Sequence, residues 1–167
     1  RGQFANFLTK KKIENTNKFL NSINYFLRKN LISIIAIKKK SKEFHARYHA
    51  KERIYEYQIV NRQGSLSIDK YKSWHIKKKI DVKLLRKAAK LLEGTHDFST
   101  FRASSCSAKS PIKKMNWVRI KKIDDKIFIK FSSKSFLQNQ VRSMVGCLHY
   151  LATNKWSLNN FKRSLNQ

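Results

Sequence analysis

The chain has 167 residues, 41% of them hydrophobic and 12% aromatic, which is enough for one domain or two small units with a buried core and excludes disorder throughout. It carries 38 Lys and Arg against 10 Asp and Glu, a formal net charge of +28, which favours a nucleic-acid partner. The open alternative is the coding bias of an AT-rich genome, which enriches lysine, with the lysines on a solvated surface. No apolar run of about eighteen residues occurs, which excludes a transmembrane helix, and neither the two cysteines nor the histidines have the spacing of a metal site.

The first part of the chain predicts a strand, a helix and a second strand. Residues 2–8 alternate loosely as in a strand, and residues 31–37 are a short apolar run typical of a buried strand. Between them, the apolar residues of 15–30 recur at helical spacing, with Asn15 or Thr16 available as the cap. The basic run 38–42 marks the junction between two units.

The second part predicts an α+β arrangement with an antiparallel sheet on one side and helices on the other. Strands are predicted at 53–61 and 72–77, followed by a helix at 81–94 that Asp81 caps and Gly94 stops. A hairpin around Asp124 and Asp125 joins 116–124 to 126–133. The remaining predicted elements are helices, and they span 136–154 and 158–166.

Arg142 is the only charged residue between positions 136 and 154, although 29% of the chain is charged. On a helix it shares a polar face with Gln138 and Gly146, next to an apolar stripe, and Gly146 leaves room for another chain or a ligand. A buried guanidinium needs an anionic partner, and no Asp or Glu lies nearby in sequence. The alternative is that Arg142 reaches the surface and is solvated, and the pattern alone leaves both open.

Five segments resemble, in content and order, the TruA family of tRNA pseudouridine synthases. They read RGQFANF, FHARYHAKERIYEYQIVN, DFSTFR, KSPIKKM and FLQNQVRSMVG, and the match to the family in which they occur extends over nearly the whole chain. FHAR followed by RxYxY, and then VRxMVG, is a specific combination. A single one of these motifs would be weak.

The resemblance implies that the full-length protein isomerises uridine to pseudouridine in the anticodon stem-loop of tRNA, at positions 38 to 40, with no metal and no organic cofactor. An aspartate carboxylate acts as nucleophile, and the target base leaves the stack first. In the family this aspartate lies in a GRTDxGVHA motif just before the segment that matches GQFANF. We therefore expect the nucleophile to lie upstream of Arg1, outside this chain, and the chain to stop short of the family's last strand after Gln167.

The same resemblance implies the site residues. Arg142 matches the arginine that pairs with the catalytic carboxylate, and Tyr55 matches a tyrosine that would stack on the extruded uracil. Arg47, Arg53 and Arg102 match arginines near the RNA-facing cleft, where a bidentate guanidinium suits phosphate. The alternatives from the residues alone are core packing for Tyr55 and surface ion pairing for the three arginines.

The implied fold consists of two RRM-like (ferredoxin-like) units related by a pseudo-twofold axis, with their antiparallel sheets side by side and helices on one face. Residues 1–43 would be the C-terminal part of the first unit, and residues 44–167 the second unit, incomplete at its C-terminus. The expected partners are tRNA and a second copy in a homodimer. The expected location is cytoplasmic, with an organelle not excluded.

Two other functions compete with this hypothesis. A catalytically inactive RNA-binding module could retain the same scaffold and charge. A basic structural protein of the ribosomal type would explain the charge, but it does not predict an uncharged helix with one arginine.

Overall fold

The computed structural model describes residues 2–165. The contacts between residues divide the chain into two compact units, Arg1–Ala50 and Lys51–Gln167.

The first unit contains one regular helix. α1 (Thr16–Leu27) begins at Asn15, whose side chain accepts a hydrogen bond from the Lys18 N–H at 2.8 Å, and a short 3₁₀ helix, η1 (Arg28–Asn30), follows. The strands predicted at 2–8 and 31–37 are absent, so that prediction is wrong for the described chain. A strand is stable only when neighbouring strands complete its hydrogen bonds, and neither segment has such a partner within residues 2–50.

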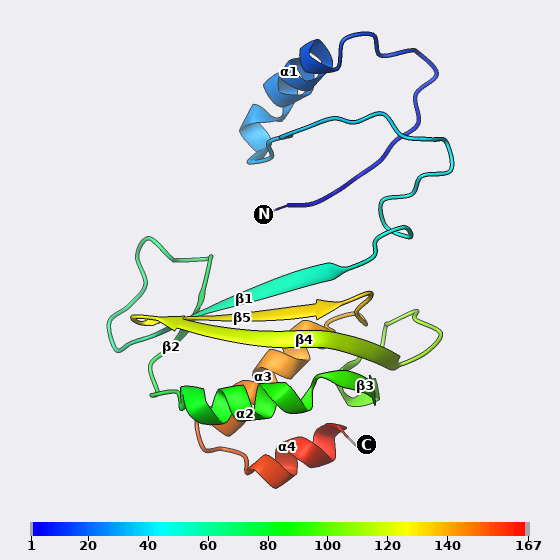
Figure 1. Ribbon diagram of the computed structural model, residues 1–167. Coiled ribbons are helices and arrows are strands. Elements are labelled where there is room, and N and C mark those ends of the chain that lie inside the picture. The colour runs from blue at the N-terminus through cyan, green and yellow to red at the C-terminus, as the bar shows by residue number, and fades with distance from the viewer. Residues whose placement is uncertain (1, 166–167) are drawn as a thin grey trace. The chain divides into compact units, whose positions relative to one another are not determined.

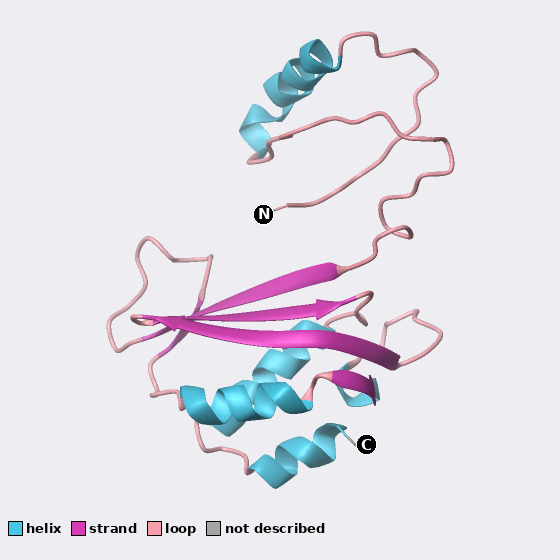
Figure 2. Ribbon diagram, in the orientation of Figure 1, coloured by secondary structure: helices cyan, strands magenta, loops and turns pink. Residues whose placement is uncertain are grey.

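The second unit is an α+β fold, as predicted, with a five-stranded sheet in the order β2-β1-β5-β4-β3 (Figure 1). Its strands are β1 (Arg53–Asn61), β2 (Trp74–Ile76), β3 (Gly94–Asp97), β4 (Ile112–Ile123) and β5 (Lys126–Ser133). Its helices are α2 (Val82–Leu91), η2 (Ser99–Phe101), α3 (Gln140–Ala152) and α4 (Leu158–Leu165). Figure 2 shows α2, α3 and α4 together on one side of the sheet.

The sheet is mixed, so the prediction of a purely antiparallel sheet is wrong at one edge. β1 pairs antiparallel with β5 from Arg53 to Val60, but parallel with β2, from Ile59 to Asn61. A parallel pair needs a long crossover connection, which residues 62–73 provide. Along the side of β1 that faces β2, only these last three residues pair within the described chain.

The predicted helices and hairpin have clear local causes. The Asp81 carboxylate accepts a hydrogen bond from the Leu84 N–H at 3.0 Å and caps α2, while Gly94, at φ 102°, ends the helical segment and starts β3. Asp124 adopts a left-handed conformation, φ 50°, in the turn between β4 and β5. Asp and Asn tolerate this conformation better than most residues.

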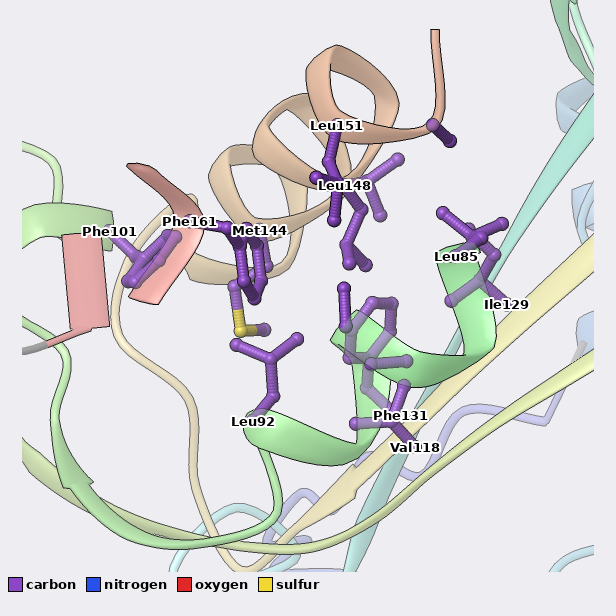
Figure 3. Close-up of a cluster of buried hydrophobic side chains, with 14 of the residues drawn as sticks. Leu85, Leu92, Phe101, Val118, Ile129, Phe131, Met144, Leu148, Leu151 and Phe161 are labelled. Atoms are coloured by element: carbon purple, nitrogen blue, oxygen red, sulfur yellow. The ribbon is translucent and has the colours of Figure 1, made fainter. Parts of the chain in front are cut away.

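The core lies between the sheet and the helices (Figure 3). Ile129 and Phe131 of β5 meet Leu85 of α2 and Met144 of α3, and all four are almost fully buried. Each such side chain contributes about 1.5–3 kcal/mol when it leaves water. This core fixes the sheet and the start of α3, where the candidate site lies.

None of the helices within residues 2–165 has the length and apolar character needed to cross a bilayer.

Candidate active site

α3 begins at the edge of the core and presents Arg142 in its first turn. The Gln140 side chain is fully buried, and its Oε1 accepts a hydrogen bond from the Leu137 N–H at 2.8 Å. This bond closes the turn before the helix, while Asn139 at the N-cap is left-handed, with φ 61°, and makes no side-chain cap. Because Val141, Met144 and the residues of the apolar stripe face the core, the first turn directs Arg142 outward.

Arg142 is exposed, as is Gln138 on the same face, so this helix face is open in the chain described. Within residues 2–165 the Arg142 side chain makes no hydrogen bond or ion pair. The sequence left open whether Arg142 is buried against an anionic partner or solvated at the surface. In the chain described, it is solvated. A guanidinium in this setting can receive an anion through its planar fork of N–H donors.

Tyr55 lies on β1 beside the segment that leads into α3. Its side chain is half exposed, at 50%, and its ring meets that of Phe136 edge to face, with the centroids 5.1 Å apart. The contact uses one side of the phenol and leaves the remainder accessible. Phe136 therefore ties Tyr55 to the segment that carries Arg142 six positions further along the chain.

The segment that leads into α3 runs from Lys134 to Gln140. The side chain of Arg53 contacts the backbone of this segment. The Arg53 guanidinium donates a hydrogen bond from Nη1 to the Lys134 carbonyl. The register of β1 against β5 places Arg53 opposite Ser133, immediately before Lys134. The arginine therefore holds the chain where it leaves β5 and turns toward α3.

Arg102 closes a loop that contacts the same segment at Gln138. Its Nη2 donates to the carbonyls of Cys106 and Ala108, at 2.6 and 2.9 Å. The loop then contacts Gln138 twice: the Ala103 N–H donates to the Gln138 carbonyl at 3.1 Å, and the Gln138 N–H approaches the Cys106 sulfur at 3.4 Å. Both bonds position Gln138, which directly precedes Asn139, the N-cap residue of α3.

The Cys106 thiol has a lowered pKa for the same reason. The Gln138 N–H contributes most, followed by the Ala108 N–H, and the positive charge of Arg102 adds to both. These donors favour the thiolate over the thiol. Burial of Cys106 acts in the opposite direction and is outweighed.

The structure thus brings Tyr55, Arg53 and Arg102 to the segment Lys134–Gln140, which leads directly to Arg142. Arg47 belongs to the first unit, where its guanidinium lies 5.9 Å from the centre of the Tyr48 ring. Within residues 2–165, no group of three His, Cys, Asp or Glu side chains is placed to hold a metal ion.

Sequence reasoning missed two residues of this site, Phe136 and Gln140. Phe136 positions Tyr55, and Gln140 closes the turn before α3. The only available signal was that both belong to the lysine-free segment around Arg142, a position that does not reveal a contact. The Gln140 side-chain nitrogen is buried without a hydrogen-bond partner in the described chain.

Comparison of the sequence with known proteins shows to which family the chain belongs. A family model described as tRNA pseudouridine synthase matches residues 88–167, which include α3 and Arg142. A tRNA pseudouridine synthase A of Pelagibacter ubique is 58% identical over 160 residues, covering 96% of this chain and 65% of that protein. The chain belongs to the TruA family of tRNA pseudouridine synthases. The resemblance first seen in FHAR, RxYxY and VRxMVG is therefore confirmed.

Two further TruA proteins match the chain at lower identity. That of Maricaulis maris is 37% identical over 150 residues, covering 90% of this chain and 60% of its own length. That of Ehrlichia canis is 45% identical over 128 residues, covering 77% of this chain and 52% of its own length. The chain thus spans between 52% and 65% of the length of these three TruA proteins.

Proposed function

We propose that the whole protein to which this chain belongs isomerises uridine to pseudouridine in tRNA, in the anticodon stem-loop at positions 38 to 40. The observation that carries this proposal is the 58% identity to a tRNA pseudouridine synthase A over nearly the whole chain. The convergence of Tyr55, Arg53 and Arg102 on the segment before Arg142 supports it.

In the proposed reaction, an aspartate outside this chain is the nucleophile. The N1–C1′ bond of uridine breaks, the uracil turns, and a C5–C1′ bond forms. C5 loses a proton and N1 gains one, so the product is an isomer and no cofactor is required. Arg142 keeps the aspartate ionised and oriented, because an adjacent guanidinium favours the charged carboxylate.

Tyr55 stacks on the extruded uracil in this proposal. The half-exposed phenol, held by Phe136 on one side, suits a base that has left the stack. Arg47, Arg53 and Arg102 are proposed to face the RNA. Because Arg53 and Arg102 already donate to backbone carbonyls, they would act there mainly by shaping the loops that meet phosphate.

The proposed fold of the second unit is RRM-like. Its support is the order β1, α2, β4, β5, α3, with β1, β5 and β4 adjacent in the sheet, which matches a split β-α-β arrangement. We also propose a pseudo-twofold relation to a first RRM-like unit, a homodimer and a cytoplasmic location. The family resemblance is the support for these three.

Replacing Arg142 by Ala in the whole protein tests the proposal. We expect the release of tritium from tRNA labelled at uridine C5 to fall at least about a hundredfold, the usual cost of losing one group that stabilises reacting charge. The dissociation constant for tRNA should change no more than about twofold, since one exposed charge among many contributes little to binding. Arg142→Lys should recover only part of the activity, because lysine lacks the planar fork.

Arg163→Ala is the matched control, because Arg163 is an exposed arginine on another helix, α4. It should leave tritium release unchanged. Full turnover by Arg142→Ala would remove Arg142 from the catalytic role. A wild-type protein that binds tRNA and releases no tritium would instead establish the competing function, an inactive RNA-binding module.

A further inference from the structure

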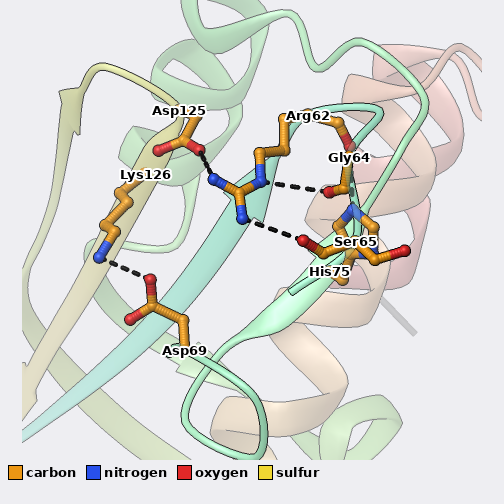
Figure 4. Close-up of polar contacts among 7 residues, drawn as sticks. All are labelled: Arg62, Gly64, Ser65, Asp69, His75, Asp125 and Lys126. Carbon is orange, nitrogen blue, oxygen red and sulfur yellow. Dashed lines mark hydrogen bonds and ion pairs between the residues drawn. The ribbon is translucent and has the colours of Figure 1, made fainter. Parts of the chain in front are cut away.

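A second polar cluster lies at the opposite end of β1 from Tyr55, where the loop 62–73 connects β1 to β2 (Figure 4). Arg62 donates to the carbonyls of Gly64 and Ser65, at 3.1 and 3.0 Å, and forms an ion pair with Asp125 at 3.0 Å. These bonds fold the first part of the loop onto the turn between β4 and β5.

A second ion pair fixes the remainder of the loop. The Lys126 ammonium lies 2.7 Å from the Asp69 carboxylate, and its hydrogen bond is the main reason that the pKa of Asp69 is lowered. The Asp69 carbonyl also accepts hydrogen bonds from the N–H groups of Lys72 and Ser73, at 3.0 and 3.2 Å. Asp69 thus links the tip of the loop to β5 through its side chain and to the following turn through its backbone.

The residue that this turn presents is Tyr71. Its side chain is 93% exposed, and its backbone is left-handed, with φ 65°. A bulky residue in that conformation is strained and persists only where the surroundings hold it. The Lys70 ammonium lies 5.3 Å from the centre of the Tyr71 ring, and Lys72, on its other side in sequence, is also exposed.

We propose that the loop 62–73 is an RNA-binding element outside the reaction site, in which Tyr71 stacks on an unpaired base and Lys70 and Lys72 receive the flanking phosphates. That the partner is RNA rests on the proposed function. An aromatic ring between two cations is the combination that binds single-stranded nucleic acid without base-specific hydrogen bonds. A loop already held in its binding conformation loses less conformational entropy on binding.

The proposal assigns the loop to tRNA affinity and not to the chemical step. In the whole protein, Tyr71→Ala should raise the dissociation constant for tRNA about tenfold, as expected when one stacked base is lost. Tyr71→Phe should bind like wild type, because the ring remains. At saturating tRNA, the tritium-release rate of Tyr71→Ala should equal that of wild type.

Tyr25→Ala is the matched control, because Tyr25 is also an exposed tyrosine, 59%, with a cation near its ring, Arg28 at 4.4 Å. It should leave the dissociation constant unchanged. The double variant Lys70→Ala with Lys72→Ala should lower the slope of log affinity against log salt by about 1 to 2.

A second pair of variants separates preorganisation from bulk charge. Asp69→Asn and Asp124→Asn each remove one negative charge, but only Asp69 is ion-paired to Lys126, while Asp124 is exposed in the neighbouring turn. Bulk electrostatics predicts slightly tighter tRNA binding for both. If the loop must be held in place, Asp69→Asn should bind two- to threefold more weakly and Asp124→Asn should not.

The outcomes distinguish this inference from the proposed function. A wild-type protein that neither binds tRNA nor releases tritium contradicts the proposed function. If the wild-type protein binds tRNA and releases tritium, and Tyr71→Ala binds tRNA as tightly as wild type, only the loop proposal is overturned. If Tyr71→Ala changes the oligomeric state in sedimentation velocity and leaves the tRNA dissociation constant intact, the loop binds protein and the RNA assignment is wrong.

Discussion

Gly146 lies within α3, one helical turn beyond Arg142. A Cβ built at this position meets no atom within 4 Å, and Gly146 is not among the residues with a positive φ. The described fold therefore gives no steric reason for glycine here. Glycine in a helix interior is less favourable than alanine by about 1 kcal/mol, so the position lowers the stability of the helix.

We expect Gly146→Ala to raise the free energy of unfolding by about 0.5–1 kcal/mol. Urea denaturation monitored by circular dichroism would measure it. Gly94→Ala is the control: its φ of 102° is unfavourable for alanine, so it should destabilise by at least about 1 kcal/mol. A destabilised Gly146→Ala would mean that the helix needs glycine for a reason absent from the described chain.

The arginines show what sequence reasoning can reach at the scale of single residues. The TruA resemblance implies Arg53 and Arg102 as site residues, and both lie near the segment before Arg142. Their bonding partners are the carbonyls of Lys134, Cys106 and Ala108. Every residue has a carbonyl, so these contacts leave no trace in the sequence.

At the scale of elements, α3 and the sheet meet at a cluster of aromatic rings. The His149 ring lies 4.7 Å from that of Trp74 on β2, and Trp74 in turn lies 6.2 Å from Tyr57 on β1. Burial in this cluster lowers the pKa of His149 below its ordinary value of 6.5, and the nearby charges of Lys155 and Lys78 lower it further. The imidazole of His149 therefore binds a proton less readily in the folded protein than in the unfolded chain.

This shift predicts how stability depends on pH. The contribution of His149 is fully present above the unfolded pKa of 6.5 and is lost as pH falls through the lower folded value. We expect His149→Gln to flatten the decrease in the free energy of unfolding between about pH 7.5 and 5.5. Urea denaturation across that range measures the slope, and Tyr150→Phe is the control one residue away. Equal slopes in His149→Gln and wild type would contradict the assignment.

The elements themselves were predictable to the extent that local patterns determine them. The strand predicted at 53–61 has the same bounds as β1, and α1 to α4 all lie within or close to the predicted helices. β3 was missed because Gly94–Asp97 is short and polar and becomes a strand only by pairing with Ile112–Met115. The strands predicted at 2–8 and 31–37 failed for the converse reason, since an apolar pattern does not supply a neighbouring strand.

At the scale of the whole molecule, the two units differ in what they bury. No residue of the described chain up to Ala50 is buried, whereas the second unit contains the complete cluster from Ile59 to Leu165. The first unit also exposes large apolar side chains, among them Phe4, Phe26 and Leu31. Burial of apolar surface is the main source of stability, so the second unit should be the stable part of this chain.

Limited proteolysis of this 167-residue chain tests that difference. Trypsin should cleave first within the basic runs 10–12 and 38–42 and leave a resistant product that begins near Lys51 and retains α4. Mass spectrometry of the time course identifies the product. The second unit has many lysines of its own, and these are the internal control. Early cleavage after Lys121 or Lys130 would contradict the expected order.

The incomplete pairing of β1 has a practical consequence for handling this chain. Ahead of Ile59, the side of β1 away from β5 has no strand beside it within the described residues, and Ile54 and Tyr55 there are half exposed. The unpaired backbone N–H and C=O groups of such an edge strand can form hydrogen bonds with an extended segment of another molecule. Concentrated solutions of the isolated chain should therefore aggregate, either as fibrils or as amorphous precipitate.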